Sequence, residues 1–254
     1  MKAKNTELKT MNTEKHRFFV PIDLITEDRI VFPIEEARHA TKVLRIAKGD
    51  LVTVIDGAGG TYTAEMEVVG NKGAIAAIVS KEVGLGESSY AVRMSVGMIK
   101  HAARWETFLE KAVELGVTRI TPLISERMQK SAFNERRAWA IMIAALKQSG
   151  RSKLPELDQP TKIKKLLQEE VGEEVKMICH ESSPDAPSIS KLLRADSTNV
   201  HILVGPEGGF SQEEITLANE AGWTTVWMGE RRLRTETAAI TSLAVVSQYL
   251  NGAE

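Results

Sequence analysis

The sequence predicts an α/β protein made of a small β-rich domain followed by a larger domain of alternating strands and helices. Short β-prone runs separated by glycine-containing turns occupy residues 16–86. Over residues 90–254, apolar strand-like runs alternate with segments of helical periodicity, a pattern typical of a mostly parallel, doubly wound sheet. Hydrophobic residues make up 43% of the chain, which suffices for a substantial core.

The first domain is expected to be a small barrel or sandwich, because its β-prone runs follow one another at regular spacing. These runs cover residues 29–32, 51–57, 61–70 and 73–83. Residues 1–15 are polar and contain no apolar stretch, so they are predicted to form a flexible lead-in and not a secretory signal.

One helical segment, residues 35–50, interrupts the β-prone runs. In a helix, Arg38, Lys42 and Arg45 would fall on one face, because they are spaced four and three residues apart. No acidic residue separates them, so the sequence predicts a basic stripe on this helix.

The larger domain follows a predicted linker at residues 84–89. Its buried strands are expected at residues 92–99, 117–124, 175–181, 199–206 and 224–229. Two long helices, over residues 103–117 and 136–150, are predicted from apolar side chains that recur at helical spacing. These apolar side chains are Trp105, Phe108, Leu109, Ala112 and Val113 in the first helix, and Trp139, Met142, Ile143 and Leu146 in the second.

Helix-start signals are clearest in the last third of the chain. Ser211 with Glu214 forms a predicted capping box, so a helix should begin there and end at Gly222. Thr235 is expected to cap the final helix, whose run Ala238–Val246 is almost entirely apolar. A helix this apolar is predicted to lie in the core or to form half of a subunit interface.

Two glycine-bearing loops are predicted to form a ligand site, because both leave the carboxyl ends of strands in an α/β sheet. Their sequences are GPEGGF at residues 205–210 and GERRLRTETA at residues 229–238. Neither a phosphate-binding loop nor a dinucleotide fingerprint is present, and Glu207 would repel an anion. The loops favour a nucleoside-like ligand held by backbone groups, although a ligand-free tight turn is the alternative.

Charge is unevenly distributed along the chain. The formal net charge is −1, yet residues 91–165 carry +8 and residues 166–254 carry −8. Such a chain can present a basic face to RNA while staying neutral overall, although solvated helix surfaces would show the same excess.

Other features narrow the functional class. No apolar run approaches the length of a membrane span. Cys179 is the single cysteine, so no internal disulfide can form and a reducing, cytoplasmic setting is expected. The five histidines show no ligand spacing, so no metal site is predicted.

The motif pair LVGPEGGFSQEEI and MGERRLRTETAAI resembles the SPOUT methyltransferase superfamily. Together with HATKVLRIAKGD, KAVELGVTRITPLISER and KQSGRSKLPEL, it resembles more narrowly the RsmE family, the 16S rRNA (uracil(1498)-N(3))-methyltransferases. The resemblance covers nearly the whole chain. It implies an N-terminal PUA-like β-barrel that binds RNA and a C-terminal SPOUT-type α/β domain with a deep trefoil knot. It also implies a homodimer that acts on 16S rRNA of the small ribosomal subunit.

The resemblance places S-adenosyl-L-methionine in the two glycine-bearing loops, which would bring their main chain close to the adenosyl group and the positive sulfonium. The implied cofactor-binding residues are Leu203, Gly205, Pro206, Glu207, Gly208, Gly209, Met228, Gly229, Leu233, Arg234, Thr237 and Ala238.

The implied reaction moves a methyl group from the sulfonium to N3 of a uridine, which must lose its imide proton. Arg234 is the first catalytic candidate, because a guanidinium can stabilise negative charge that develops on the uracil oxygens. Its alternative is a structural ion pair with Glu236 or Glu230. Glu207 and Glu236 are candidate proton acceptors, and either could instead act as a favourable charge at a helix N-terminus.

RNA is expected to contact basic and polar residues of both domains, mostly through its phosphates, and the target uridine must leave its stack. The candidates are Arg17, Arg38, Lys42, Arg45, Arg127, Lys130, Gln148 and Arg151. Three alternatives stay open: a SPOUT enzyme with another RNA target or a ribose 2′-oxygen target, a non-catalytic RNA-binding ribosome-assembly protein, and an ordinary nucleotide-binding enzyme.

Overall fold

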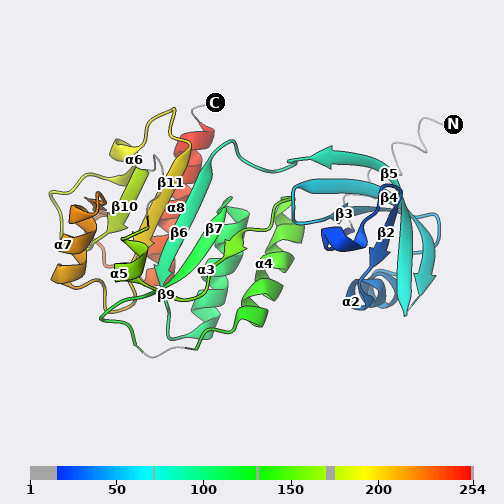
Figure 1. The fold of residues 1–254 in the computed structure, drawn as a ribbon, viewed down its shortest axis with the longest axis horizontal. Helices are drawn as coiled ribbons and strands as arrows, with labels where there is room; N and C mark the ends of the chain where they lie inside the picture. The colour runs from blue at the N-terminus through cyan, green and yellow to red at the C-terminus, as the bar shows by residue number, and fades with distance from the viewer. Residues whose placement is uncertain (1–15, 71, 130–131, 170–174, 253–254) are drawn as a thin grey trace. The chain divides into compact units, whose positions relative to one another are not determined.

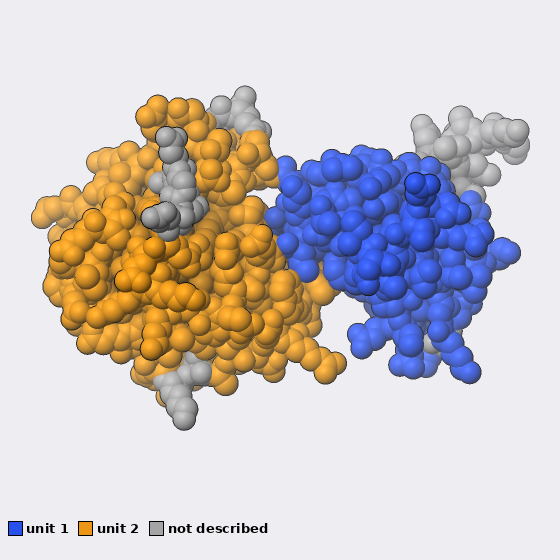
Figure 2. Space-filling model, in the orientation of Figure 1, with its two compact units in different colours: residues 1–87, 146–154 blue, residues 88–145, 155–254 orange. Residues whose placement is uncertain are grey.

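The computed structural model describes residues 16–252, apart from residues 71, 130–131 and 170–174. The lead-in predicted over residues 1–15 lies outside the described residues. The chain divides into two compact units, which Figure 2 shows in different colours. Unit 1 comprises residues 1–87 and 146–154, and unit 2 comprises residues 88–145 and 155–254.

Unit 1 is built on a five-stranded sheet with the order β1-β3-β4-β5-β2 (Figure 1). The strands are β1 (Arg17–Phe19), β2 (Arg29–Phe32), β3 (Leu51–Ile55), β4 (Gly60–Gly70) and β5 (Gly73–Val83). The four expected β-prone runs all form strands. Strand β1, which pairs in parallel with β3, was not predicted, because three residues are too few to show alternation.

The basic helix of unit 1 is shorter than its sequence pattern predicts. A short 3-10 turn, η1 (Ile22–Leu24), precedes it, and the helix itself consists of α2 (Ile34–Arg38) followed by one π-helical turn, η2 (His39–Val43). Arg45 lies beyond the helix with a φ of 55°, a left-handed conformation that ends helices. The predicted stripe is therefore wrong for Arg45, whereas Arg38 and Lys42 do lie on the helical segment.

Unit 2 contains a parallel sheet with the order β12-β10-β11-β6-β7-β8, and β9 pairs with β7 beside it. Its strands are β6 (Ala91–Gly97), β7 (Arg119–Ile124), β8 (Glu156–Leu157), β9 (Thr161–Lys162), β10 (Val175–Cys179), β11 (Asn199–Val204) and β12 (Thr224–Val226). Every recorded pair in this sheet is parallel, which confirms the predicted α/β architecture.

Helices cover both faces of this sheet. They are α3 (Ala102–Glu114), α4 (Glu135–Ser149), α5 (Ile163–Leu166), α6 (Ile189–Leu192), α7 (Gln212–Glu220) and α8 (Thr235–Asn251). Helix α8 packs against β6, β11, α3 and α6 (Figure 1). On the other face, Leu203 of β11 shares a core with Ile163 of α5 and Ile215 of α7.

The final helix contributes to the core of its own chain. Leu243 and Val246 are fully buried, while Val245 and Tyr249 are 36% and 37% exposed on the other side. Sequence alone left core and subunit interface as alternatives, and the buried side of α8 is core. The homodimer and the trefoil knot stay predictions. None of the helices in the described part of the chain has the length and apolar character needed to cross a membrane.

The predicted capping signals of the last third are mostly confirmed. The Ser211 side chain accepts from the Glu214 backbone N–H, and the Glu214 carboxylate accepts from the Ser211 backbone N–H, which completes the capping box. Gly222 follows the end of α7 with a φ of 82°. The prediction for Thr235 is wrong, because Arg234 occupies the N-cap position and Thr235 is the first helical residue of α8.

A partly buried charge network ties β7 to the chain that follows β8. The Asp158 carboxylate accepts from the Arg119 guanidinium over 2.8 Å (Nη2 to Oδ1) and lies 3.4 Å from Nη2 of Arg93. Burial alone would raise the pKa of Asp158. Hydrogen bonds from Arg119 and Thr121 lower this pKa by more than burial raises it, so the net pKa is below its usual value.

Asp158→Asn should therefore reduce the free energy of unfolding at pH 7 by about 1.5–3 kcal/mol, the usual contribution of a hydrogen bond to a charged group. Because the folded-state pKa is depressed, this stabilisation is present above a pH of about 4 and is lost as the pH falls through the folded pKa. Urea unfolding of both proteins at stepwise lower pH measures the difference. Asp196→Asn, which alters the exposed Arg194 pair, is the control. A difference that stayed constant down to low pH would contradict the prediction.

Candidate functional site

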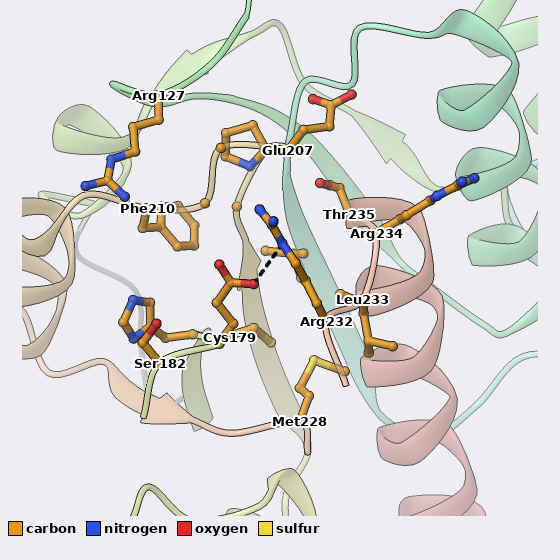
Figure 3. A pocket seen from close by; sticks show the side chains of 18 of the residues that line it. Arg127, Cys179, Ser182, Glu207, Phe210, Met228, Arg232, Leu233, Arg234 and Thr235 are labelled. Atoms are coloured by element: carbon orange, nitrogen blue, oxygen red, sulfur yellow. Dashed lines mark ion pairs between the residues drawn. The ribbon is translucent and has the colours of Figure 1, made fainter. Parts of the chain in front are cut away.

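A cavity of about 350 Å³ lies in unit 2 at the carboxyl ends of β10, β11 and β12. Three loops surround it: residues 179–182, residues 204–210 and residues 228–235 (Figure 3). Arg127, from the chain after β7, and Ala238, from the first turn of α8, complete the lining. The carboxyl ends of parallel strands are the usual ligand-binding edge of such sheets, so the cavity lies where the sequence predicts a ligand site.

The glycines of residues 205–210 allow close packing of the protein's own backbone. A Cβ atom on Gly208 would lie 2.7 Å from the Arg127 carbonyl oxygen, and Gly209 has a φ of 68°. Gly97, at the end of β6, comes nearer still, because a Cβ there would lie 2.2 Å from the Pro206 nitrogen. The loop is therefore shaped by backbone-to-backbone contacts, in addition to any approach to a ligand.

Glu214 fixes the far end of this loop. Its carboxylate closes the capping box of α7 and also accepts from the Glu126 backbone N–H over 2.8 Å. The residue is 3% exposed, so these bonds are sheltered from water. Glu214 thereby links the start of α7 to the segment after β7, in which Arg127 lies beside Gly208.

The two candidate proton acceptors differ in position. Glu207 lines the cavity, its Oε1 atom accepts from the Lys100 backbone N–H over 3.1 Å, and its Oε2 atom is buried with no hydrogen-bond partner among the described residues. Glu236 does not line the cavity, and its Oε1 atom lies 3.6 Å from Nε of Arg104. The Oε2 atom of Glu236 is likewise buried with no hydrogen-bond partner among the described residues, so the two glutamates differ in that Glu207 alone lines the cavity.

Arginine side chains from residues 231–234 line the same cavity. Nε of Arg232 lies 3.3 Å from Oε2 of Glu181, an ion pair that joins two of the three loops. Figure 3 shows Arg232 reaching inward, whereas Arg234 extends away from it. Arg234 is the exposed N-cap residue of α8, and among the residues that the structure describes no ion pair joins it to Glu236 or Glu230.

Cys179 also lines the cavity, but burial raises the pKa of its thiol to about 12. The thiol is therefore neutral at physiological pH and unsuited to nucleophilic attack. Among the residues that the structure describes, no cluster of His, Cys, Asp or Glu could hold a metal ion.

Ten of the twelve predicted cofactor-binding residues line the cavity. They are Gly205, Pro206, Glu207, Gly208, Gly209, Met228, Gly229, Leu233, Arg234 and Ala238. Leu203 of β11 is buried in the core, and Thr237 is exposed on α8.

Sequence reasoning missed several lining residues: Cys179, His180, Glu181, Ser182, Phe210, Arg231 and Arg232. The first four could have been found because the loop after β10 leaves the sheet at the same edge as the two glycine-bearing loops. Because β10 lies between β11 and β12 in the sheet, its exit loop must reach the same site.

The predicted RNA contacts are distributed over both units. Arg127 lines the cavity, and Lys130 lies outside the described residues. The remaining candidates belong to unit 1: Arg17, Arg38, Lys42, Arg45, Gln148 and Arg151.

The expectation for Arg151 is not supported by its surroundings. Arg151 is 4% exposed, and its Nη2 atom lies 2.8 Å from Oε2 of Glu87. Glu87 also accepts the backbone N–H groups of Ser152 and Lys153, so Arg151 belongs to a buried structural network within unit 1.

Family models match both parts of the chain. The RNA methyltransferase domain model matches residues 86–247, and the RNA methyltransferase PUA domain model matches residues 33–79. The ribosomal RNA small subunit methyltransferase E of Synechocystis sp. is 28% identical over 92% of this chain and 78% of its own length.

Comparison with solved structures gives the same result as the family models and the Synechocystis relative. Ribosomal RNA small subunit methyltransferase E from Neisseria gonorrhoeae, bound to S-adenosyl methionine, has a TM-score of 0.83 at 31% identity, and the match covers 92% of this chain and 97% of that one. The chain belongs to the RsmE family of RNA methyltransferases. A putative methyltransferase from Legionella pneumophila, in complex with the same cofactor, has a TM-score of 0.80 at 33% identity over 91% of this chain and 96% of its own.

RsmE membership confirms the family resemblance and both kinds of domain that it implied. Within this RsmE fold, the two glycine-bearing loops of the sequence form walls of the 350 Å³ cavity.

Proposed function

We propose that this protein uses S-adenosyl-L-methionine to methylate N3 of a uridine in 16S rRNA of the small ribosomal subunit. The observation that carries the proposal is the cavity formed by the GPEGGF and GERRLRTETA loops at the carboxyl ends of parallel strands. Relatives that are 31% and 33% identical over more than nine-tenths of this chain hold this cofactor in their solved structures.

The lining chemistry fits the cofactor. Glu207 and Glu181 supply negative charge for a ligand that carries a sulfonium and an ammonium group, and Arg232 can meet its carboxylate. Phe210, Met228 and Leu233 provide apolar surface for the adenosyl group. When bound, the cofactor supplies an electrophilic methyl group.

Two residues would then act on the uracil. Arg234 would stabilise negative charge on the uracil oxygens as N3 loses its proton. Glu207 is favoured over Glu236 as the proton acceptor, because Glu207 lines the cavity and Glu236 does not.

RNA binding is proposed to involve exposed basic residues of unit 1. Combined Lys42→Ala and Arg45→Ala should weaken RNA binding and reduce the slope of log affinity against log salt by about one unit per lost phosphate contact. S-adenosylmethionine affinity should not change. Filter binding across a salt series measures the slope, and Lys191→Ala, at an exposed lysine of α6, is the control. An unaltered slope would show that these side chains are only solvated surface.

Mass spectrometry of 16S rRNA from a deletion strain tests the proposed reaction. We expect one uridine base to lack its methyl group and to regain it when the purified protein and cofactor are added. A missing ribose methyl group would instead identify a 2′-oxygen target. Unchanged rRNA together with no cofactor binding by calorimetry would favour the non-catalytic assembly protein.

A further inference from the structure

Glu214 is a buried carboxylate that joins two separate backbone segments. The residue is 3% exposed. Its Oε2 atom accepts from the Ser211 backbone N–H over 2.9 Å, and its Oε1 atom accepts from the Glu126 backbone N–H over 2.8 Å. Burying a charge is costly unless donors surround it, so both bonds are needed to hold this side chain in place. The two donors belong to the start of α7 and to the segment after β7.

The helix cap of α7 needs only one of these two oxygens. In a capping box, the side chain at the third helical position accepts from the N-cap N–H, and glutamine serves as well as glutamate there. The Ser211 side chain completes the box by accepting from the Glu214 backbone N–H over 3.2 Å. The bond from Glu126 lies outside the capping box, so it needs an explanation beyond helix capping.

Glu126 directly precedes the residue that packs against the cofactor loop, residues 205–210. A Cβ atom on Gly208 would lie 2.7 Å from the Arg127 carbonyl oxygen and 2.9 Å from the Arg127 Cβ atom. At the end of the loop, Phe210 is 2% exposed and packs in the core that α7 shares. The loop is therefore held at Phe210 by the core and at Gly208 by the backbone of Arg127.

Glu214 itself does not line the cofactor cavity, whereas Arg127, Gly208 and Phe210 do. Figure 3 shows Arg127 and Phe210 on the same side of this cavity. Glu214 can therefore influence a bound ligand only through the backbone that it holds in place. Support of this kind lowers the cost of ordering the loop when a ligand binds.

We propose that Glu214 is a positioning residue for the cofactor. Its Oε1 atom fixes the backbone of Glu126 and Arg127 against Gly208, and this contact sets the shape of the loop that receives S-adenosylmethionine. The proposal rests on the proposed function for the identity of the cofactor. Without this bond the protein should still fold, but the loop should bind the cofactor more weakly.

Two variants of Glu214 and one matched control test the proposal. Glu214→Ala removes both carboxylate bonds, and Glu214→Gln keeps one acceptor oxygen for the helix cap but lacks a second. Calorimetry well below the melting temperature should find cofactor affinity about 10-fold weaker in both, the order expected for the loss of one hydrogen bond to a charged group. Ser211→Ala removes the other half of the capping box and leaves both carboxylate bonds in place, so it should lower the melting temperature and bind the cofactor normally.

Hydrogen exchange follows the bond itself and needs no cofactor. The Glu126 backbone N–H should exchange faster in the Glu214 variants and at the wild-type rate in Ser211→Ala. Glu214→Gln also provides the second variant if Glu214→Ala does not fold.

Three results would overturn the proposal. They are wild-type cofactor affinity in a folded Glu214 variant whose Glu126 N–H exchanges faster, unchanged exchange of this N–H in both variants, and an equal loss of affinity in Ser211→Ala. A wild-type protein that does not bind the cofactor would instead refute the proposed function, and the exchange measurement would still show whether Glu214 holds the backbone of Glu126.

Discussion

Gly97→Ala should abolish S-adenosylmethionine binding, although Gly97 does not line the cofactor cavity. The added Cβ atom would lie 2.2 Å from the Pro206 nitrogen and 2.7 Å from the Gly205 carbonyl carbon. These are backbone atoms, so the change cannot be absorbed by a side-chain rotation. Residues 205–210 must shift, and the overpacking should also cost about 1–3 kcal/mol of the free energy of unfolding.

Calorimetric titration of cofactor and a melting curve on the same preparation measure both effects. Gly73→Ala is the control, because a Cβ there meets no described atom within 4 Å. A folded Gly97→Ala protein with wild-type cofactor affinity would show that the loop after β11 is not the cofactor site. If Gly97→Ala does not fold, the result would agree with the tight packing at Gly97 but would not test the cofactor site. Gly208→Ala, whose Cβ would meet Arg127, would then test the loop itself.

Arg234→Lys should reduce the single-turnover methylation rate by roughly 10²–10³, the range for the loss of one charge-stabilising donor. Lysine keeps the positive charge but lacks the planar, forked guanidinium that can meet a carbonyl oxygen with two donors. Cofactor affinity should be nearly unchanged. Raising the pH should partly restore the rate, because more of the uracil is then deprotonated in solution.

The alternative for Arg234 is a structural role at the start of α8, where it occupies the N-cap position. That role predicts a lower melting temperature and a normal rate in the folded fraction. Arg194→Lys, at an exposed residue paired with Asp196, is the control for the substitution itself. Rates across pH, cofactor affinity and melting temperature measured together separate the two roles, and a normal rate would refute the catalytic one.

Sequence patterns located most elements because the signals are local. The run at residues 73–83 became β5 with the same bounds, and the capping box at Ser211 started α7 where expected. Local signals failed where a neighbour in space decided the outcome. The helix with Arg38 and Lys42 ends at Val43, and Arg45 takes a left-handed conformation that the spacing of basic residues did not indicate.

The same distinction holds for the site. The two glycine loops were identified from the sequence because glycine, a following cap and a preceding apolar run are adjacent in the chain. The third loop, residues 179–182, was missed because its part in the site depends on β10 lying between β11 and β12. Strand order is a long-range property that spacing along one chain does not show.

By itself, the sequence determined the order of the longer strands and helices, the two glycine loops and, through resemblance, the family. Only the tertiary structure decided which side chains meet in those loops. It placed Glu207 beside the cavity, paired Glu236 with Arg104, and buried Arg151 against Glu87. The physical reason is that a charge takes its role from the partner and the burial that folding gives it, and those partners are far apart in the chain.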